Sequence, residues 1–275
     1  MVKPIISKFS GDKSLFINRF FSKIFIINLK DKTKRFKKVS NQFIKKGVKY
    51  QRFNAVDGRA DPKDYPKKKK ELEKKYGVKI KRGINPPTAS LVIGTLEILK
   101  KQVKNKWKRI LICEDDVILD RKIIKRFHEG VDELGDEEWD LLYLGCGNTC
   151  GVRGISDTKT RLNKYMTSLS IVNKDEYNWY VQNRLDLRGP VYKDIEYSKN
   201  LSMPIIPGGT WGYGISLEGA KRILKLFGNN VKNHIDQLLG KEISKENLIA
   251  YSFDPPIIWH EDGAFRADSD IPWEW

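Results

Sequence analysis

The chain has 275 residues, 40% of them hydrophobic and 32% charged, which is enough to bury the core of one large domain. Its formal net charge is +17, and the charge is uneven. Residues 1–110 hold 32 Lys and Arg against 8 Asp and Glu, whereas the other residues hold 20 against 27. No apolar run approaches the length of a membrane span, which argues against an integral membrane protein.

The first 21 residues lack the continuous apolar core of a signal peptide, because Lys8, Asp12, Lys13 and Arg19 interrupt them. We therefore expect a soluble protein of a cytosol-like compartment, or of a secretory lumen only if a longer precursor has been trimmed.

Alternating strands and helices are predicted in the first half. An apolar strand at Ile24–Leu29 precedes a helix at Lys32–Lys46, which Gly47 ends, and a short strand at Lys49–Asn54 follows. A strand–helix–strand order calls for parallel strands joined by a right-handed crossover.

The lysine-rich segment Lys67–Lys75 carries Glu71 and Glu73 at helical spacing, which is typical of a solvated helix face. Nucleic-acid binding is the competing interpretation. It is not favoured, because no aromatic residues alternate with the basic ones to stack on bases. The basic half is instead expected to attract an anionic ligand.

Three adjacent carboxylates, Glu114, Asp115 and Asp116, follow an apolar stretch, Ile110–Cys113, which predicts a buried strand. Like charges side by side repel, and a fold tolerates them mainly where a cation neutralises them. Such oxygen ligands suit Mg²⁺ or Mn²⁺ carrying a phosphate, bound beyond the strand ends of an open α/β sheet. Alternation along the strand separates Asp115 from its two neighbours. The alternative is an acidic cap on the next helix.

A third central strand is predicted at Trp139–Gly145, and a glycine-rich strand, Gly208–Ser216, precedes a helix at Leu217–Phe227. Dense glycines indicate backbone passing close to a ligand. Trp211 and Tyr213 would then stack on a ring of that ligand, and the alternative is that they are ordinary core aromatics.

The segment around Asp236 and the three cysteines also carry predictions. A helix starting near Asn230 is expected to turn Asp236 toward the site. Cys146 and Cys150 lie in a glycine-containing loop, where a disulfide and two free thiols are both compatible with the spacing, whereas Cys113 reads as a small core residue.

Taken in order, these motifs resemble glycosyltransferase family 25, which includes bacterial lipopolysaccharide sugar transferases and animal collagen galactosyltransferases. The resemblance covers about Ile24 to Trp273 and rests on the order of six individually weak motifs. They are Asn28, Leu29 and Arg35; Ala55–Gly58; Glu114–Asp116; Trp139–Gly145; Tyr213–Ala220; and Ile235–Asp236. The tail Trp259–Gly263 is closer to the collagen enzymes. One departure is Leu91–Gly94, which stands where the family usually has Ser-His.

The resemblance implies a GT-A-like α/β fold with a Rossmann-like, mostly parallel central sheet flanked by helices. It implies an N-terminal extension, 1–22, and a single domain, 23–275, divided into a nucleotide-sugar half, 23–145, and an acceptor half, 146–275. The implied reaction is inverting transfer of galactose or glucose from a UDP-sugar, with Mn²⁺ or Mg²⁺, to a hydroxyl of collagen-type hydroxylysine, its glycoside or another glycan.

Roles for individual residues follow from the same resemblance. The metal ligands are Glu114, Asp116 and His260. The general base on the acceptor hydroxyl is Asp236, with Asp262 second. The donor-binding residues are Asn28, Leu29, Arg35, Asp57, Gly58, Asp115, Gly209, Thr210, Trp211 and Tyr213.

Three alternatives stay open at this stage: a lipooligosaccharide-type sugar transferase, a basic nucleic-acid-binding protein, and a catalytically inactive sugar-binding relative. The sequence defines no oligomeric state.

Overall fold

The computed structural model describes residues 14–146, 195–204 and 207–260. The helices are α1 Ser14–Phe20, α2 Thr33–Lys45, the 3-10 turn η2 Pro62–Asp64, α3 Tyr65–Tyr76, α4 Pro86–Lys104, α5 Ile123–Leu134, α8 Leu217–Phe227 and α9 Ile235–Ser244. The strands are β1 Lys23–Asn28, β2 Gln51–Asn54, β3 Lys79–Ile80, β4 Arg109–Glu114, β5 Val117–Leu119, β6 Leu141–Gly145, β7 Ile195–Glu196, β8 Leu201–Met203, β9 Gly212–Ser216, β10 Asn230–Val231, β11 Ala250–Phe253 and β12 Ile258–His260.

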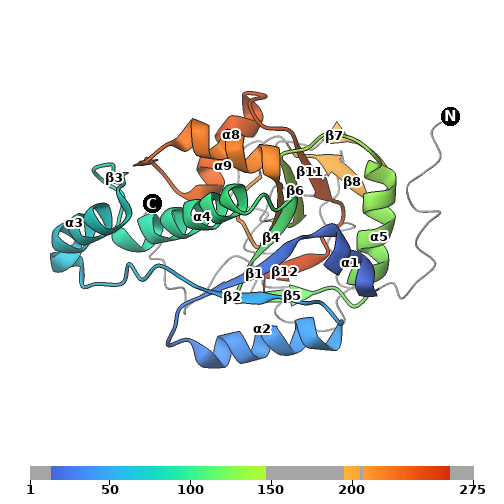
Figure 1. Cartoon of the computed structure of the whole chain (residues 1–275), viewed down its shortest axis with the longest axis horizontal. Helices are drawn as coiled ribbons and strands as arrows, with labels where there is room; N and C mark the ends of the chain where they lie inside the picture. The colour runs from blue at the N-terminus through green and yellow to red at the C-terminus, as the bar shows by residue number, and fades with distance from the viewer. Residues whose placement is uncertain (1–13, 147–194, 205–206, 261–275) are drawn as a thin grey trace, which may run out of the picture.

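The main sheet has eight strands in the order β2-β1-β4-β9-β6-β11-β8-β7 (Figure 1). The pairs β1–β2, β1–β4 and β6–β11 are parallel, whereas β9 runs antiparallel to both β4 and β6. Strand β8 is antiparallel to β11 and to β7. All the strands except β9 and β8 therefore share one direction, and the predicted α/β class is confirmed.

Successive residues of the central strands enter two different cores, as the two-residue period of a strand requires. On one face, Phe25, Ile110 and Ile112 pack with apolar residues of α4, α8 and α9. On the other, Ile26 and Leu111 pack with apolar residues of α1, α2 and α5. Each fully buried side chain of this kind stabilises the fold by roughly 1.5–3 kcal/mol. The sheet is thus covered on both faces, as a strand apolar along its whole length predicts.

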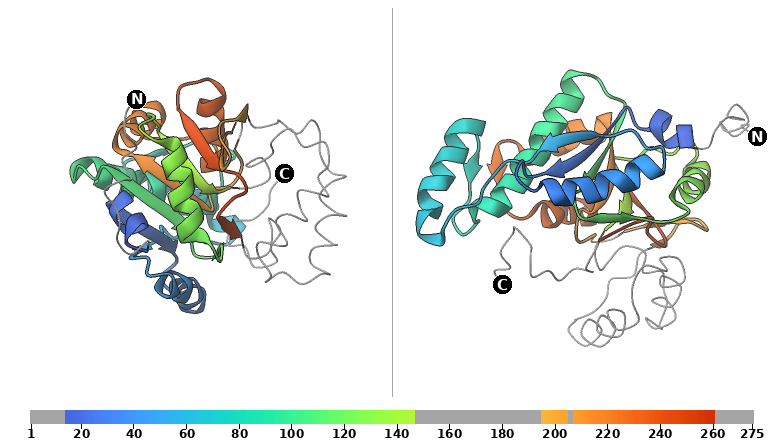
Figure 2. Two further views of the ribbon diagram at one scale, coloured as in Figure 1. Left: turned by 90° about the vertical axis from the view of Figure 1, so that its right-hand side faces the viewer. Right: turned by 90° about the horizontal axis from the view of Figure 1, so that it is seen from below.

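Helix α1 belongs to the second of these cores. Ile17 and Phe20 are buried, and the Phe20 ring lies edge-on to the Phe127 ring of α5 at 5.3 Å. By contrast, α3 lies at one end of the molecule, away from the sheet (Figures 1 and 2), and Leu72 is its only buried residue. The predicted lysine-rich helix is therefore present, and its outer side is exposed.

Most predicted elements form within two residues of their expected bounds, but the helix expected to start near Asn230 does not. Asn230 and Val231 form β10, which pairs in parallel with β3. Backbone hydrogen bonds from Lys79 to the Asn229 carbonyl and from Lys81 to the Val231 carbonyl hold this segment extended. Helix α9 consequently begins only at Ile235.

Within the described ranges, none of the helices combines the length and apolarity that crossing a bilayer demands. Cys113 is a buried free thiol, as predicted, and burial raises its pKa. Cys146 is disulfide-bonded. Cys150, considered above as its partner, lies outside the described residues.

Candidate active site

The acidic triplet lies where two adjacent parallel strands end. Glu114 is the last residue of β4, and the register pairs it with Ile27 of β1. The next residue of each strand, Asn28 and Asp115, therefore meet, and the Asn28 amide donates a hydrogen bond to Asp115. The C-terminal edge of the sheet thus collects the polar residues that the two apolar strands carry at their ends, as the sequence predicts.

A third strand brings a histidine to the same edge. Strand β12 pairs antiparallel with β5, and His260 lies opposite Val117. Its Nε2 is 3.5 Å from Oδ1 of Asp116. One ligand atom each from Glu114, Asp116 and His260 lies within 4.8 Å of the others. Two carboxylates and an imidazole form a ligand set that suits Mn²⁺, so the three residues predicted as metal ligands are close enough to share an ion.

Two glycines allow β12 to reach this position. A Cβ on Gly145 would lie 1.9 Å from the Ile258 carbonyl oxygen, and a Cβ on Gly212 would lie 2.7 Å from the Ile258 side chain. Any larger residue at either position would push β12, and His260 with it, away from the sheet. The segment that packs closely against Gly212 is therefore β12 of the same chain. The prediction from the glycine density, that a ligand would pack there, is not supported at this position.

Glu114 is held in a crowded acidic environment. Its Oε1 accepts a hydrogen bond from the Thr210 hydroxyl at 3.0 Å, and its backbone N–H donates to the Trp211 carbonyl at 3.0 Å. Burial, the neighbouring charges of Asp116 and Asp115, and that of Asp236 raise the pKa of Glu114 to about 8. A bound cation would relieve this cost, because it favours the charged form of a carboxylate.

Asp236 lies in the first turn of α9 and faces the same cluster. Its Oδ2 accepts a hydrogen bond from the Gly209 N–H at 3.1 Å, and its Oδ1 accepts one from the Gln237 N–H at 2.8 Å. Gly209 and Thr210 are consecutive, so a two-residue segment connects the Asp236 carboxylate to Glu114. Asp262, the second predicted base, lies outside the described residues.

Arg35 of α2 contacts the two aspartates of the triplet. Its Nη2 is 2.6 Å from Oδ1 of Asp115 and 2.5 Å from Oδ2 of Asp116. Asp115 thus contacts Arg35 and Asn28, whereas Asp116 shares Arg35 and also contacts His260. The strand ends at Glu114, and both aspartates lie in the turn that follows, so the strand alternation predicted for the triplet does not extend to them.

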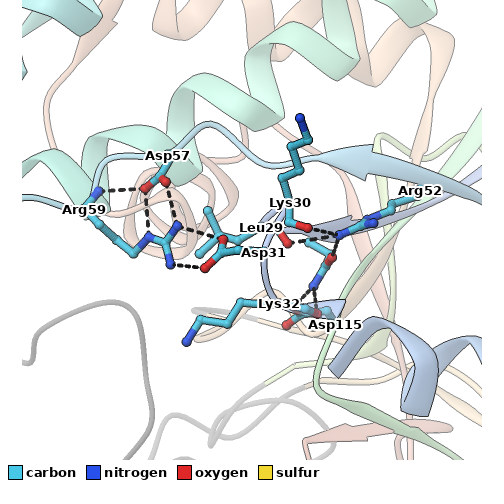
Figure 3. A network of polar contacts seen from close by, with 9 residues as sticks. Leu29, Lys30, Asp31, Lys32, Arg52, Asp57, Arg59 and Asp115 are labelled. Carbon is cyan, nitrogen blue, oxygen red and sulfur yellow. Dashed lines mark hydrogen bonds and ion pairs between the residues drawn. The ribbon is translucent and has the colours of Figure 1, made fainter. Parts of the chain in front are cut away.

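A second arginine cluster is formed by Arg59, Asp57 and Asp31 (Figure 3). Arg59 donates to both carboxylate oxygens of Asp57, and it makes a two-pronged contact with Asp31 at 2.8 Å per bond. Hydrogen bonds from Arg59 lower the pKa of Asp31 to about 2 and also lower that of Asp57. Asp57, predicted to bind the donor, therefore also fixes Arg59, and the sequence analysis singled out neither Arg59 nor Asp31.

The remaining predicted donor-binding residues differ in position. Trp211 lies at the site, its ring 5.7 Å from that of His260. Tyr213 is 2% exposed and stacks on Tyr143 at 6.1 Å, so its ring belongs to the core, which was the alternative interpretation. Gly58 packs against the start of α4, where a Cβ would lie 2.2 Å from the Pro86 carbonyl oxygen.

The β1–α2 loop contributes main-chain groups. The Leu29 carbonyl accepts a hydrogen bond from Arg52 at 3.1 Å. Arg52 also donates to the Asn28 side chain and was not predicted (Figure 3).

The model of glycosyltransferase family 25 (LPS biosynthesis protein) matches residues 21–239. No curated protein matches the chain. Among solved structures, the inositol-1-phosphate CTP transferase from T. maritima is 10% identical, with 90% of this chain and 92% of that chain covered and a TM-score of 0.37. A197 from STIV is 11% identical, with 90% and 98% covered and the same TM-score of 0.37. Both are too distant to inform on function.

Proposed function

The chain belongs to glycosyltransferase family 25, and on that premise we propose that it transfers a hexose, galactose or glucose, from a UDP-sugar to a hydroxyl acceptor with the help of Mn²⁺. The observation that carries the proposal is the cluster of Glu114, Asp116 and His260 ligand atoms within 4.8 Å at the C-terminal edge of the sheet. A nucleoside diphosphate brings oxygens that complete such a partly protein-made coordination shell.

The ligand set fits a divalent ion on two counts. Its donors are two carboxylates and one imidazole, and the burial and neighbouring carboxylates that raise the pKa of Glu114 make a nearby cation favourable for its charged form. When bound, the ion supplies Lewis acidity to the diphosphate leaving group. The protein holds Glu114 through the Thr210 hydroxyl and Asp116 through Arg35, so two of the three ligands have a fixed orientation before the ion arrives.

Asp236 is the proposed general base. In an inverting transfer the acceptor hydroxyl attacks the anomeric carbon as the bond to the diphosphate oxygen breaks, and the hydroxyl proton passes to a carboxylate oxygen. The N–H groups of Gly209 and Gln237 fix the orientation of the Asp236 carboxylate, and each of its oxygens keeps a second lone pair. Asp262 is the second candidate.

The acceptor is proposed to be a saccharide hydroxyl of a lipopolysaccharide-type glycan. The family description supports this choice, since it names LPS biosynthesis. Collagen-type hydroxylysine, or its glycoside, is the competing acceptor, supported by the resemblance of the tail that begins at Trp259. A hydroxylysine peptide and a lipooligosaccharide core therefore belong in the same assay.

The test is a panel of nucleotide sugars incubated with the protein and Mn²⁺, first for donor hydrolysis and then with each acceptor. We expect release of UDP from a UDP-hexose, loss of this activity in excess chelator, and its return with Mn²⁺. Full activity in excess chelator would remove the metal from the proposal. Binding of UDP without turnover of any donor would indicate a catalytically inactive sugar-binding relative.

A further inference from the structure

Arg52, the second residue of β2, makes an unusual set of contacts. Its Nη2 donates to the side-chain oxygen of Asn28 and lies 3.1 Å and 3.0 Å from the carbonyl oxygens of Leu29 and Lys30 (Figure 3). Its guanidinium also lies 4.5 Å from the centre of the Phe36 ring on α2. One side chain therefore holds the end of β1, the loop after it and the helix that this loop enters.

These contacts determine which way the Asn28 amide points. An amide offers one acceptor oxygen and one donor nitrogen, and the two ends are interchangeable in shape. Because Arg52 has no acceptor, it takes the oxygen of Asn28, and the amide nitrogen is left to face Asp115. That nitrogen donates to Oδ2 of Asp115 and to the Lys32 carbonyl at 3.1 Å. With the amide reversed, its oxygen would face a carboxylate and its nitrogen a guanidinium, and both contacts would be repulsive.

The contacts continue from Asp115 to the proposed metal ligands. Oδ1 of Asp115 lies 2.6 Å from Nη2 of Arg35. The same nitrogen donates to Oδ2 of Asp116 at 2.5 Å. Oδ1 of Asp116 is thereby turned toward His260. An unbroken series of polar contacts thus runs from Arg52 to the ligand side of Asp116.

We propose that Arg52 is a positioning residue of the metal site, which it orders through Asn28 and Asp115. Asp115 is then no ligand itself, and its charge serves to hold Arg35 against Asp116. The inference rests on the proposed metal site. It adds Arg52, a residue of a different strand, to that site. Among the described residues, the contacts of the Arg52 guanidinium do not include Glu114, Asp116 or His260.

The test measures Mn²⁺ affinity directly, by calorimetry or by electron paramagnetic resonance of the free ion, without any turnover. Arg52→Met keeps the aliphatic stem and removes the donors, and we expect Mn²⁺ affinity to fall about tenfold, the lower end of the usual effect of outer-shell partners. Asn28→Ala removes the next link and should weaken binding at least as much. Thermal unfolding with and without Mn²⁺ establishes that each variant is folded.

Arg59→Met is the matched control. Arg59 holds the same β1–α2 loop through Asp31, and its loss removes the same single charge from the same edge of the sheet, but it has no contact with Asn28. We expect Mn²⁺ affinity to change less than about twofold in this variant, because screened surface charge at a distance contributes little.

The double variant Arg52→Met/Asn28→Ala separates action through Asn28 from a general loosening of the loop. If Arg52 acts through Asn28, the double variant binds Mn²⁺ no more weakly than Asn28→Ala alone, so the two effects are not additive. Full additivity, or equal losses in Arg52→Met and Arg59→Met, would overturn the inference. A wild-type protein that binds no Mn²⁺ would refute the metal site instead, so the two failures are distinguishable.

Discussion

The raised pKa of Glu114 predicts an unusual pH dependence for the stability of the metal-free protein. In the folded state Glu114 keeps its proton up to about pH 8, whereas in the unfolded chain it loses it near 4.5. Between these values the folded state binds one proton more than the unfolded state. The free energy of unfolding therefore falls as pH rises, by roughly 1.4 kcal/mol per pH unit. This contribution of Glu114 to stability is fully present below pH 4.5 and is lost as the pH rises through 8.

Urea denaturation in chelator at pH 5.5 and at pH 7.5 measures this slope. Over two pH units the contribution of Glu114 amounts to roughly 2–3 kcal/mol. Other groups titrate in the same range, so the matched comparison is Glu114→Gln, which keeps the size of the side chain and an oxygen for the Thr210 hydroxyl but cannot ionise. We expect the stability of this variant to be less pH-dependent than that of the wild type by about that amount.

Mn²⁺ should offset the loss of stability at high pH in the wild type but not in Glu114→Gln. A ligand carboxylate must be deprotonated, so Mn²⁺ binding at pH 6.5 should release a proton, and affinity should increase up to about pH 8. In Glu114→Gln neither proton release nor tight Mn²⁺ binding is expected. Parallel pH profiles of stability for the two proteins, in the absence of metal, would refute the assignment of the raised pKa to Glu114.

Three further predictions concern the architecture and the reaction. Gly145→Ala should destabilise the protein by about 1–3 kcal/mol or more and weaken Mn²⁺ binding, because the new methyl meets the Ile258 carbonyl, whereas Gly94→Ala, with 3.8 Å to its nearest neighbour, should be neutral or stabilising in urea titration. Asp236→Asn should lower turnover roughly 10²–10⁴-fold and leave UDP-sugar affinity unchanged; near wild-type transfer would move the base to Asp262. UDP with Mn²⁺ at a hundredfold excess over the dissociation constant should add roughly 2–3 kcal/mol of stability, while duplex DNA should bind weakly and lose affinity steeply with salt; salt-resistant, sequence-selective DNA binding without a UDP effect would contradict the transferase assignment.

The elements of this fold could be predicted because their signals are local. The apolar runs of β1 and β4, the helix start at Ser216 and the glycine after Phe227 all act within one element, and α8 was predicted with its observed bounds. The position of β9 could not be predicted, since it inserts antiparallel between β4 and β6 although it follows both in the chain. Pairing of strands so distant in sequence is decided by the whole sheet rather than by the segment.

In the candidate site, too, the residues with a local sequence signal could be predicted, and those placed by distant strand pairing could not be predicted from their own segment. Glu114 and Asp116 were predicted from their neighbours alone, because three adjacent carboxylates are conspicuous after an apolar strand. His260 was selected through the family resemblance, and its approach depends on the pairing of β12 with β5. Arg52 and Arg59 were missed because residues 1–110 hold 32 Lys and Arg. Nothing in the sequence distinguishes the two that fix site carboxylates and amides from those that only face solvent.

The pairing of β5 with β12 also sets the order in which the site is completed during synthesis. Chains fold from the N-terminus as they leave the ribosome. Strands β1 and β4, with Asn28 and the acidic triplet, emerge early, but His260 follows Asp116 by nearly the whole second half of the protein. A nascent chain therefore carries the crowded carboxylates first, and the proposed cation site is complete only when β12 packs over Gly145 and Gly212. Binding of the proposed ion would therefore require that β12 has already paired with β5.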